Sequence, residues 1–87
     1  MKARVLIGWN LRRLRVSKAL SQEALGLVAG IEPSYIGRLE RGRENATIET
    51  LEVLSVALDA HISAFFVIPE PGAEMPQPLR PGRKPKK

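Results

Sequence analysis

Residues 21–42 read SQEALGLVAGIEPSYIGRLERG, a pattern that predicts two short helices joined by a tight turn. Ser21 can cap the first helix, because its hydroxyl accepts a hydrogen bond from a free backbone N–H. Gly30 stands where a chain leaving a helix commonly needs a positive φ. Pro33 fits the first turn of the second helix, and Gly42 ends it. Such a helix-turn-helix places its second helix in a DNA major groove.

Apolar residues inside this stretch recur at helical spacing. Leu25, Val28 and Ile31 predict the buried stripe of the first helix, and Ile36 and Leu39 predict that of the second. Gly37 within the second helix costs about 1 kcal/mol relative to Ala, and two explanations stay open: close approach of the backbone to a partner, or simple tolerance.

Further helices are predicted before and after this stretch. Thr47 is a suitable N-cap for a later helix, and His61 is expected to lie on the surface at the start of a last, short helix. Trp9 lies off the main apolar face, as a partly covered surface residue or as an interface anchor. The apolar faces comprise Ile7, Leu11 and Leu14, and later Ile48, Leu51, Leu54, Val56 and Leu58. Helices are predicted over 3–18, 21–29, 33–41, 48–58 and 62–67.

The composition excludes several classes of protein. The 87 residues contain no Cys and one His, so neither a disulfide framework nor a structural zinc is expected. No metal-ligand spacing, phosphate-binding loop or catalytic set occurs, so we expect no cofactor and no enzyme activity. No apolar run approaches a membrane span, and the N-terminal one is too short for a signal peptide, which favours a cytoplasmic protein.

Charge and proline divide the chain at about residue 68. Residues 1–68 hold nine Lys/Arg against seven Asp/Glu, whereas residues 69–87 hold five Lys/Arg, two Glu and six of the seven prolines. We therefore expect a folded domain over 1–68 and a disordered basic tail over 69–87. The tail is interpreted either as a solubilising extension or as an arm attracted to phosphates.

Residues 7–66 resemble the phage repressor and Cro (XRE-like) family of helix-turn-helix regulators. The motifs that carry the resemblance include NLRRLR (10–15), LSQEAL (20–25), AGI (29–31), SYI (34–36), RLERG (38–42) and ETL (49–51). The resemblance implies an all-α, compact five-helix lambda-repressor-like domain, with its helix-turn-helix over about 22–41.

The family's pattern also implies structural roles. A small residue is needed in helix two where helix three crosses closely, and Gly26 fills that place. Arg15 would form an ion pair with Glu40, so both are expected to be structural rather than DNA contacts. Ala19 stands where Gly is usual, and a positive φ there would cost stability.

The resemblance further implies a set of DNA-binding residues. Gln22 would meet the phosphate backbone, Pro33, Ser34 and Arg38 would face base edges, Tyr35 would reach a phosphate or thymine methyl, and Arg43 and Asn45 would contact the backbone. Arg38 is the best candidate for base readout, since a guanidinium can bond guanine O6 and N7 together. Pro33 and Gly37 offer few polar groups, so DNA shape would carry part of the specificity.

These features together predict a transcriptional regulator that binds double-stranded DNA as a homodimer on an inverted repeat. Phe66, Val67 and Ile68 are the candidate dimer surface, whereas Ile62 and Phe65 are expected to complete the core. Small stand-alone family members of this kind include controller proteins and antitoxins. A protein-interaction module that docks a toxin or another regulator is the alternative. No ligand-sensing domain is present, so no small-molecule ligand is expected.

Overall fold

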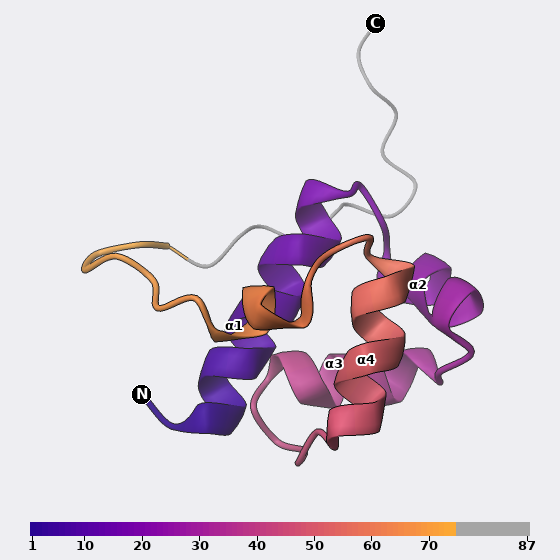
Figure 1. Ribbon diagram of the computed structural model, residues 1–87, viewed down its shortest axis with the longest axis horizontal. Coiled ribbons are helices and arrows are strands. Elements are labelled where there is room, and N and C mark those ends of the chain that lie inside the picture. Colours follow the sequence, from indigo (N-terminus) through magenta and orange to yellow (C-terminus); the bar gives the residue numbers. More distant parts are fainter. Residues whose placement is uncertain (75–87) are drawn as a thin grey trace, which may run out of the picture.

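The fold is all-α over residues 1–74, the part of the chain that the computed structural model describes (Figure 1). Four α-helices are followed by a short 3-10 helix, so the expected fifth helix is present in a different form from the first four. No helix within residues 1–74 is both long and apolar enough to cross a membrane. The elements are α1 (Ala3–Ser17), α2 (Gln22–Ala29), α3 (Pro33–Glu40), α4 (Ile48–Ala57) and η1 (Ile62–Phe66).

The helix starts follow from local side-chain chemistry. The Ser21 and Thr47 hydroxyls each accept a 3.0 Å hydrogen bond from the backbone N–H three residues later. His61 caps η1 through Nδ1, which accepts from the Ser63 N–H at 3.1 Å. Pro33 is the first residue of α3. The four predicted helix starts are confirmed. Ser21, Thr47 and His61 each accept a hydrogen bond from an N–H group that the helix would otherwise leave unpaired, and Pro33 has no N–H group at the position where one would be unpaired.

The helix ends depend on residues in the left-handed region. Gly30 has φ 70° after α2, and Gly42 has φ 71° after α3. Ala19, after α1, has φ 59°, as expected for the place where Gly is usual. The next residue, Leu20, donates its N–H to the Arg15 carbonyl at 3.1 Å, which closes the last turn of α1. Ala19 therefore holds a conformation that is unfavourable for a residue with a Cβ atom.

The hydrophobic core is built from all five elements. Leu11, Leu25 and Ile36 are completely buried, and Phe65 anchors η1 to the same core. Ile7 and Ile62 are partly buried against it. The core residues are Leu11, Leu14, Leu25, Ile36, Leu39, Leu51, Leu54, Leu58 and Phe65.

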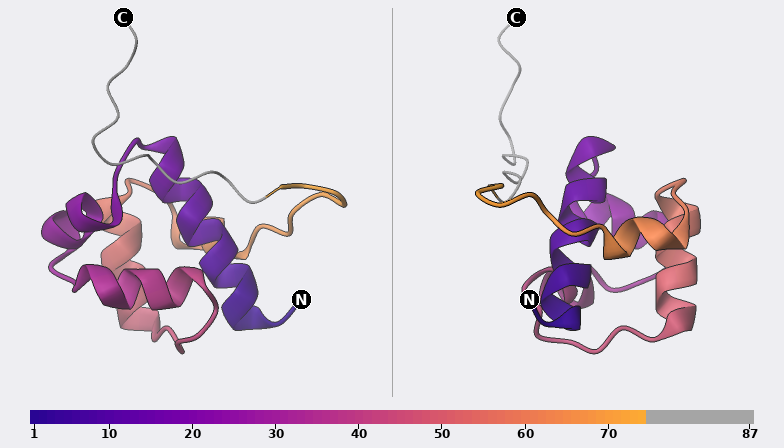
Figure 2. Two further views of the ribbon diagram at one scale, coloured as in Figure 1. Left: turned by 180° about the vertical axis from the view of Figure 1, so that it is seen from behind. Right: turned by 60° about the vertical axis from the view of Figure 1, so that its left-hand side comes forward.

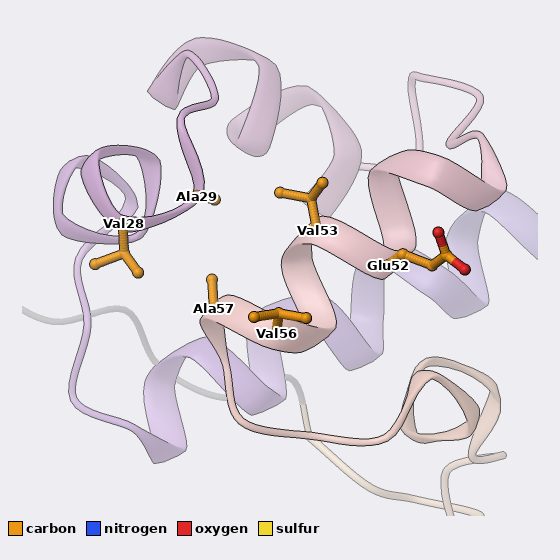
Figure 3. A pocket seen from close by; sticks show the side chains of 6 residues that line it. All are labelled: Val28, Ala29, Glu52, Val53, Val56 and Ala57. Carbon is orange, nitrogen blue, oxygen red and sulfur yellow. The ribbon is translucent and has the colours of Figure 1, made fainter.

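Three residues predicted to be in the core lie at the surface instead: Val28, Ile48 and Val56 have exposed fractions of 65%, 64% and 81%. Val56 follows Leu54 by two positions, which places it on the opposite side of α4. Ile48 is the first residue of that helix and projects beyond the core. Val28 and Val56 line an open groove between α2 and α4, together with Ala29, Glu52, Val53 and Ala57 (Figure 3).

α3 lies directly against the first two helices. Figure 2 (left) shows it crossing α1 and meeting α2 through a short turn. A Cβ atom on Gly8 of α1 would clash with the carbonyl oxygens of Leu39 and Glu40. A Cβ atom on Gly26 of α2 would stand 2.5 Å from the Ile31 carbonyl oxygen and 3.2 Å from Cγ of Pro33. The expected close crossing at Gly26 is confirmed, and Gly8 provides a second one.

A buried amide ties the end of the domain to α1. Asn10 is fully buried, and its Nδ2 donates to the carbonyl oxygens of Phe65 and Val67, both at 2.9 Å. Arg13 donates to Asn10 Oδ1 at 3.0 Å and to the Ala64 carbonyl at 3.0 Å. These bonds satisfy backbone groups that the short 3-10 helix leaves unpaired.

Of the expected tail, residues 69–74 are described and contain no helix or strand. The basic residues of the tail, within 75–87, lie outside the described residues.

Candidate nucleic-acid interface

The two faces of α3 differ in chemistry. Ile36, Leu39 and Glu40 point into the molecule and are buried. Ser34, Arg38 and Arg41 follow one another at i, i+4 and i+7 and so form a single polar stripe away from the core. Ser34 and Arg41 are exposed, and Arg38 is partly exposed. The helix, with Arg41 directly after its last residue, therefore presents a hydroxyl and two guanidinium groups to solvent along one line.

Arg38 is held by two neighbours. Its Nε lies 2.7 Å from Oε2 of Glu44 in an ion pair. Its guanidinium carbon lies 5.6 Å from the centroid of the Tyr35 ring, within the range of a cation–π interaction. The Tyr35 hydroxyl donates to the Asn45 carbonyl oxygen at 3.4 Å. The structure thus brings together three of the expected site residues, and it adds Glu44, which the sequence analysis did not identify.

Gln22 lies at the start of α2, where it was expected, but its amide is already engaged. Nε2 donates to Glu40 Oε1 at 3.1 Å. Its Oε1 would stand 3.4 Å from a Cβ atom on Gly37, and Nη1 of Arg41 would stand 3.3 Å from that atom. The side chains of Gln22 and Arg41 therefore lie over Gly37. A Cβ atom on Gly37 would be in tight contact only with the flexible ends of these two side chains, and the same packing places Arg41, a residue without a predicted role, beside Gln22.

The other predicted contacts are spread around α3. Pro33 is partly buried against Gly26, and Arg43 and Asn45 are exposed in the loop that follows α3. Ser34 is exposed near the N-terminal end of the helix. Their contacts with DNA stay predictions.

A buried ion pair fixes α3 from behind. Arg15 Nε donates to Glu40 Oε2 at 2.6 Å, and Nη2 donates to Oε1 at 3.0 Å; the two side chains are only 3% and 4% exposed. Arg15 Nη1 also donates to the Leu20 carbonyl at 2.8 Å. Because Glu40 accepts from Gln22 as well, the carboxylate connects α1, α2 and α3.

Apolar side chains are exposed at the end of the described chain. Phe66, Val67 and Ile68, the candidate dimer surface, have exposed fractions of 45%, 50% and 79%. They follow directly after the buried Phe65. Val53 and Val56 add exposed apolar area on α4, where both line the groove between α2 and α4.

The fold and these residues define a helix-turn-helix protein, and residues 11–65 match the helix-turn-helix family model HTH_3. The chain belongs to this family, which confirms the XRE-like resemblance. An uncharacterised HTH-type transcriptional regulator, y4dJ of Sinorhizobium fredii, is 45% identical over 58 residues, which cover 67% of this chain and 75% of the relative.

Solved structures show the same fold. The restriction-modification controller protein C.AhdI from Aeromonas hydrophila matches with a TM-score of 0.70 and 40% identity, covering 72% of this chain and 96% of the other. A tetramer of the controller protein C.Esp1396I, in complex with its natural 35 base-pair operator, matches with a TM-score of 0.69 and 26% identity, covering 76% of this chain and 87% of the other.

Proposed function

We propose that the protein is a transcriptional regulator that binds a specific DNA sequence as a homodimer, with α3 in the major groove. The observation that carries the proposal is the polar stripe of α3, where Ser34, Arg38 and Arg41 face away from a helix whose other side is fixed in the core. A rigid helix with a few polar side chains on its outer side is the usual reader of base edges.

Different residues make the contacts with the bases and the contacts with the phosphates. Arg38 reads a base, because its guanidinium can form two hydrogen bonds with guanine. Pro33, Ser34 and Tyr35 complete the surface that faces the bases. Gln22, Arg43 and Asn45 contact phosphates and set the orientation of α3 without reading sequence. Gln22 is at the N-terminus of α2, where backbone N–H groups also favour an anion.

The exposed apolar residues at the end of η1 and directly after it support a dimer. Phe66, Val67 and Ile68 directly follow the buried core residue Phe65 in the sequence. Association of two chains would remove the exposed apolar surface of these three residues from water. A two-fold axis through this surface would direct two copies of α3 to half-sites about one helical turn apart, or a multiple of it. In C.Esp1396I, a tetramer occupies a 35 base-pair operator.

One observation favours a second candidate function. The groove between α2 and α4 has exposed valines on both sides, and the Glu52 carboxylate points away from α2 (Figure 3). Such a groove suits a protein-interaction module that docks another regulator or a toxin, with DNA binding secondary.

Selection of bound sequences from a random pool of duplex DNA tests the proposal. We expect an enriched inverted repeat whose half-site centres are about 10 base pairs apart, or a multiple of this. An enriched single half-site would refute the homodimer. A pool that shows no enrichment after repeated rounds, although the protein is folded, would refute sequence-specific binding and favour the interaction module.

A further inference from the structure

Glu44 lies in the loop after α3, and its side chain is directed back to that helix. α3 ends at Glu40, the positive φ of Gly42 turns the chain, and the Arg43 N–H donates to the Arg38 carbonyl oxygen at 2.9 Å. Two residues after Gly42, the Glu44 carboxylate accepts a hydrogen bond from Arg38 Nε at 2.7 Å, with side-chain exposures of 31% for Glu44 and 43% for Arg38. The turn therefore places an acidic group beside the main candidate for base readout.

The contact uses only one of the five N–H groups of Arg38. Nε bonds Glu44, whereas Nη1 and Nη2 have no hydrogen-bond acceptor among residues 1–74. The Tyr35 ring lies 5.6 Å from the guanidinium carbon. Glu44 fixes the Nε edge of the guanidinium group, and the Tyr35 ring packs beside the group. The two terminal nitrogens, Nη1 and Nη2, are therefore left for a ligand. Two adjacent donors of this kind match guanine O6 and N7.

The same loop holds the second contact. The Asn45 carbonyl accepts from the Tyr35 hydroxyl at 3.4 Å, so consecutive loop residues restrain both the arginine and the ring beside it. Arginine is among the side chains that lose the most conformational entropy when they are ordered. A side chain that is ordered before binding loses less of this freedom on the DNA.

We propose that Glu44 is a positioning residue that sets the base specificity of Arg38 without touching a base. The inference rests on the proposed function and deepens it. Glu44 has two effects of opposite sign. Its hydrogen bond aims the terminal nitrogens of Arg38 and raises discrimination between bases, whereas its negative charge is repelled by phosphates and lowers affinity for every sequence.

Two substitutions separate these effects. Glu44→Ala removes both the acceptor and the charge, whereas Glu44→Gln keeps an oxygen acceptor and removes the charge. Glu52→Ala is the matched control, since Glu52 is an exposed carboxylate on α4 whose side chain lines the groove there. Each variant is titrated, at one salt concentration, with the selected operator, with that operator altered at each single base pair, and with unrelated DNA.

We expect both Glu44 variants to bind unrelated DNA more tightly than the wild type. Discrimination at the base pair read by Arg38 should fall about tenfold in Glu44→Ala and should be largely kept in Glu44→Gln. Glu52→Ala should keep the wild-type discrimination. The proposal is overturned if Glu44→Ala keeps full discrimination, or if Glu44→Gln loses as much as Glu44→Ala.

A DNA-free measurement separates failure of this inference from failure of the proposed function. The Arg38 Nε–H resonance of the full chain should exchange slowly with water in the wild type and in Glu44→Gln, and rapidly in Glu44→Ala. Fast exchange in the wild type would overturn the positioning role even if DNA binding is specific. A wild type that binds all sequences equally would refute the proposed function, and the specificity role of Glu44 with it.

Discussion

The Arg15 guanidinium donates to both oxygens of the Glu40 carboxylate, at 2.6 and 3.0 Å, in a site where each side chain is at most 4% exposed. This pair joins the end of α1 to the end of α3. Gln22 adds a third helix by donating to Glu40 Oε1. The orientation of the candidate reading helix therefore depends on a buried charge rather than on apolar packing alone.

Removal of one partner of this pair should be costly. Arg15→Ala and Glu40→Ala should each lower the free energy of unfolding by about 3–5 kcal/mol, because the other charge stays buried without its partner. The double variant Arg15→Met/Glu40→Leu should lose less than either single variant. Urea denaturation measures all three. Arg38→Ala, in the exposed pair with Glu44, is the control and should change stability by less than about 1 kcal/mol. A small effect in both single buried variants would contradict this account.

Ala19 offers a stabilising substitution. Its φ of 59° is unfavourable for alanine by about 1–2 kcal/mol, whereas glycine adopts this conformation readily. The greater freedom of glycine in the unfolded chain offsets part of the gain. Ala19→Gly should therefore raise the free energy of unfolding by about 0.5–1 kcal/mol, as measured by urea denaturation. Ala24→Gly, in the first turn of α2, should instead destabilise by up to about 1 kcal/mol. Destabilisation by Ala19→Gly would show that the strain at this turn is absent in solution.

Local and long-range features differed in how well the sequence predicted them. The caps at Ser21 and Thr47 and the positive φ at Gly30 were correctly predicted, because each depends on chemistry within a few residues. Val56 was wrongly placed in the core, although its spacing of two residues from the buried Leu54 puts it on the opposite side of α4. The role of Asn10 was missed, since its acceptor on Phe65 lies 55 residues away.

The candidate site shows the same division. Arg38 and Tyr35 were assigned as DNA contacts from the family resemblance, and the contact between the two side chains could have been anticipated from their i, i+3 spacing. Glu44 was not predicted, because its approach to Arg38 depends on the path of the chain after Gly42. Gln22 was predicted as a phosphate contact alone, whereas the structure also bonds it to Glu40. That bond becomes visible only once α2 and α3 are placed together.

A charged substitution tests the proposed dimer surface. Ile68 is 79% exposed in the single chain, so Ile68→Asp should leave the fold intact but place two carboxylates in the proposed interface. Sedimentation velocity should show a dimer for the wild type and a monomer for the variant at the same concentration. Leu27→Asp, at an 86% exposed position on α2, is the matched control and should stay dimeric. A dimer that withstands Ile68→Asp would place the interface elsewhere.

The basic tail should act through charge. Residues 79–87 contain five Lys/Arg and no acidic residue, so their deletion should weaken binding to unrelated DNA and reduce the salt dependence of affinity. Titrations at several salt concentrations measure both quantities. The dimer and the preferred sequence should be unaffected. An unchanged salt slope would favour the interpretation of the tail as a solubilising extension.

The proposed function depends on α3 reading bases through Arg38. Mobility-shift titration of the wild type and Arg38→Ala, on the selected operator and on versions with single base-pair changes, tests it most directly. We predict that the wild type discriminates by about 1–3 kcal/mol at one base pair of each half-site and that Arg38→Ala does not. Gln22→Ala should weaken binding to all sequences without changing the preference. If Arg38→Ala kept both the affinity and the preference of the wild type, α3 would not be reading DNA through this residue.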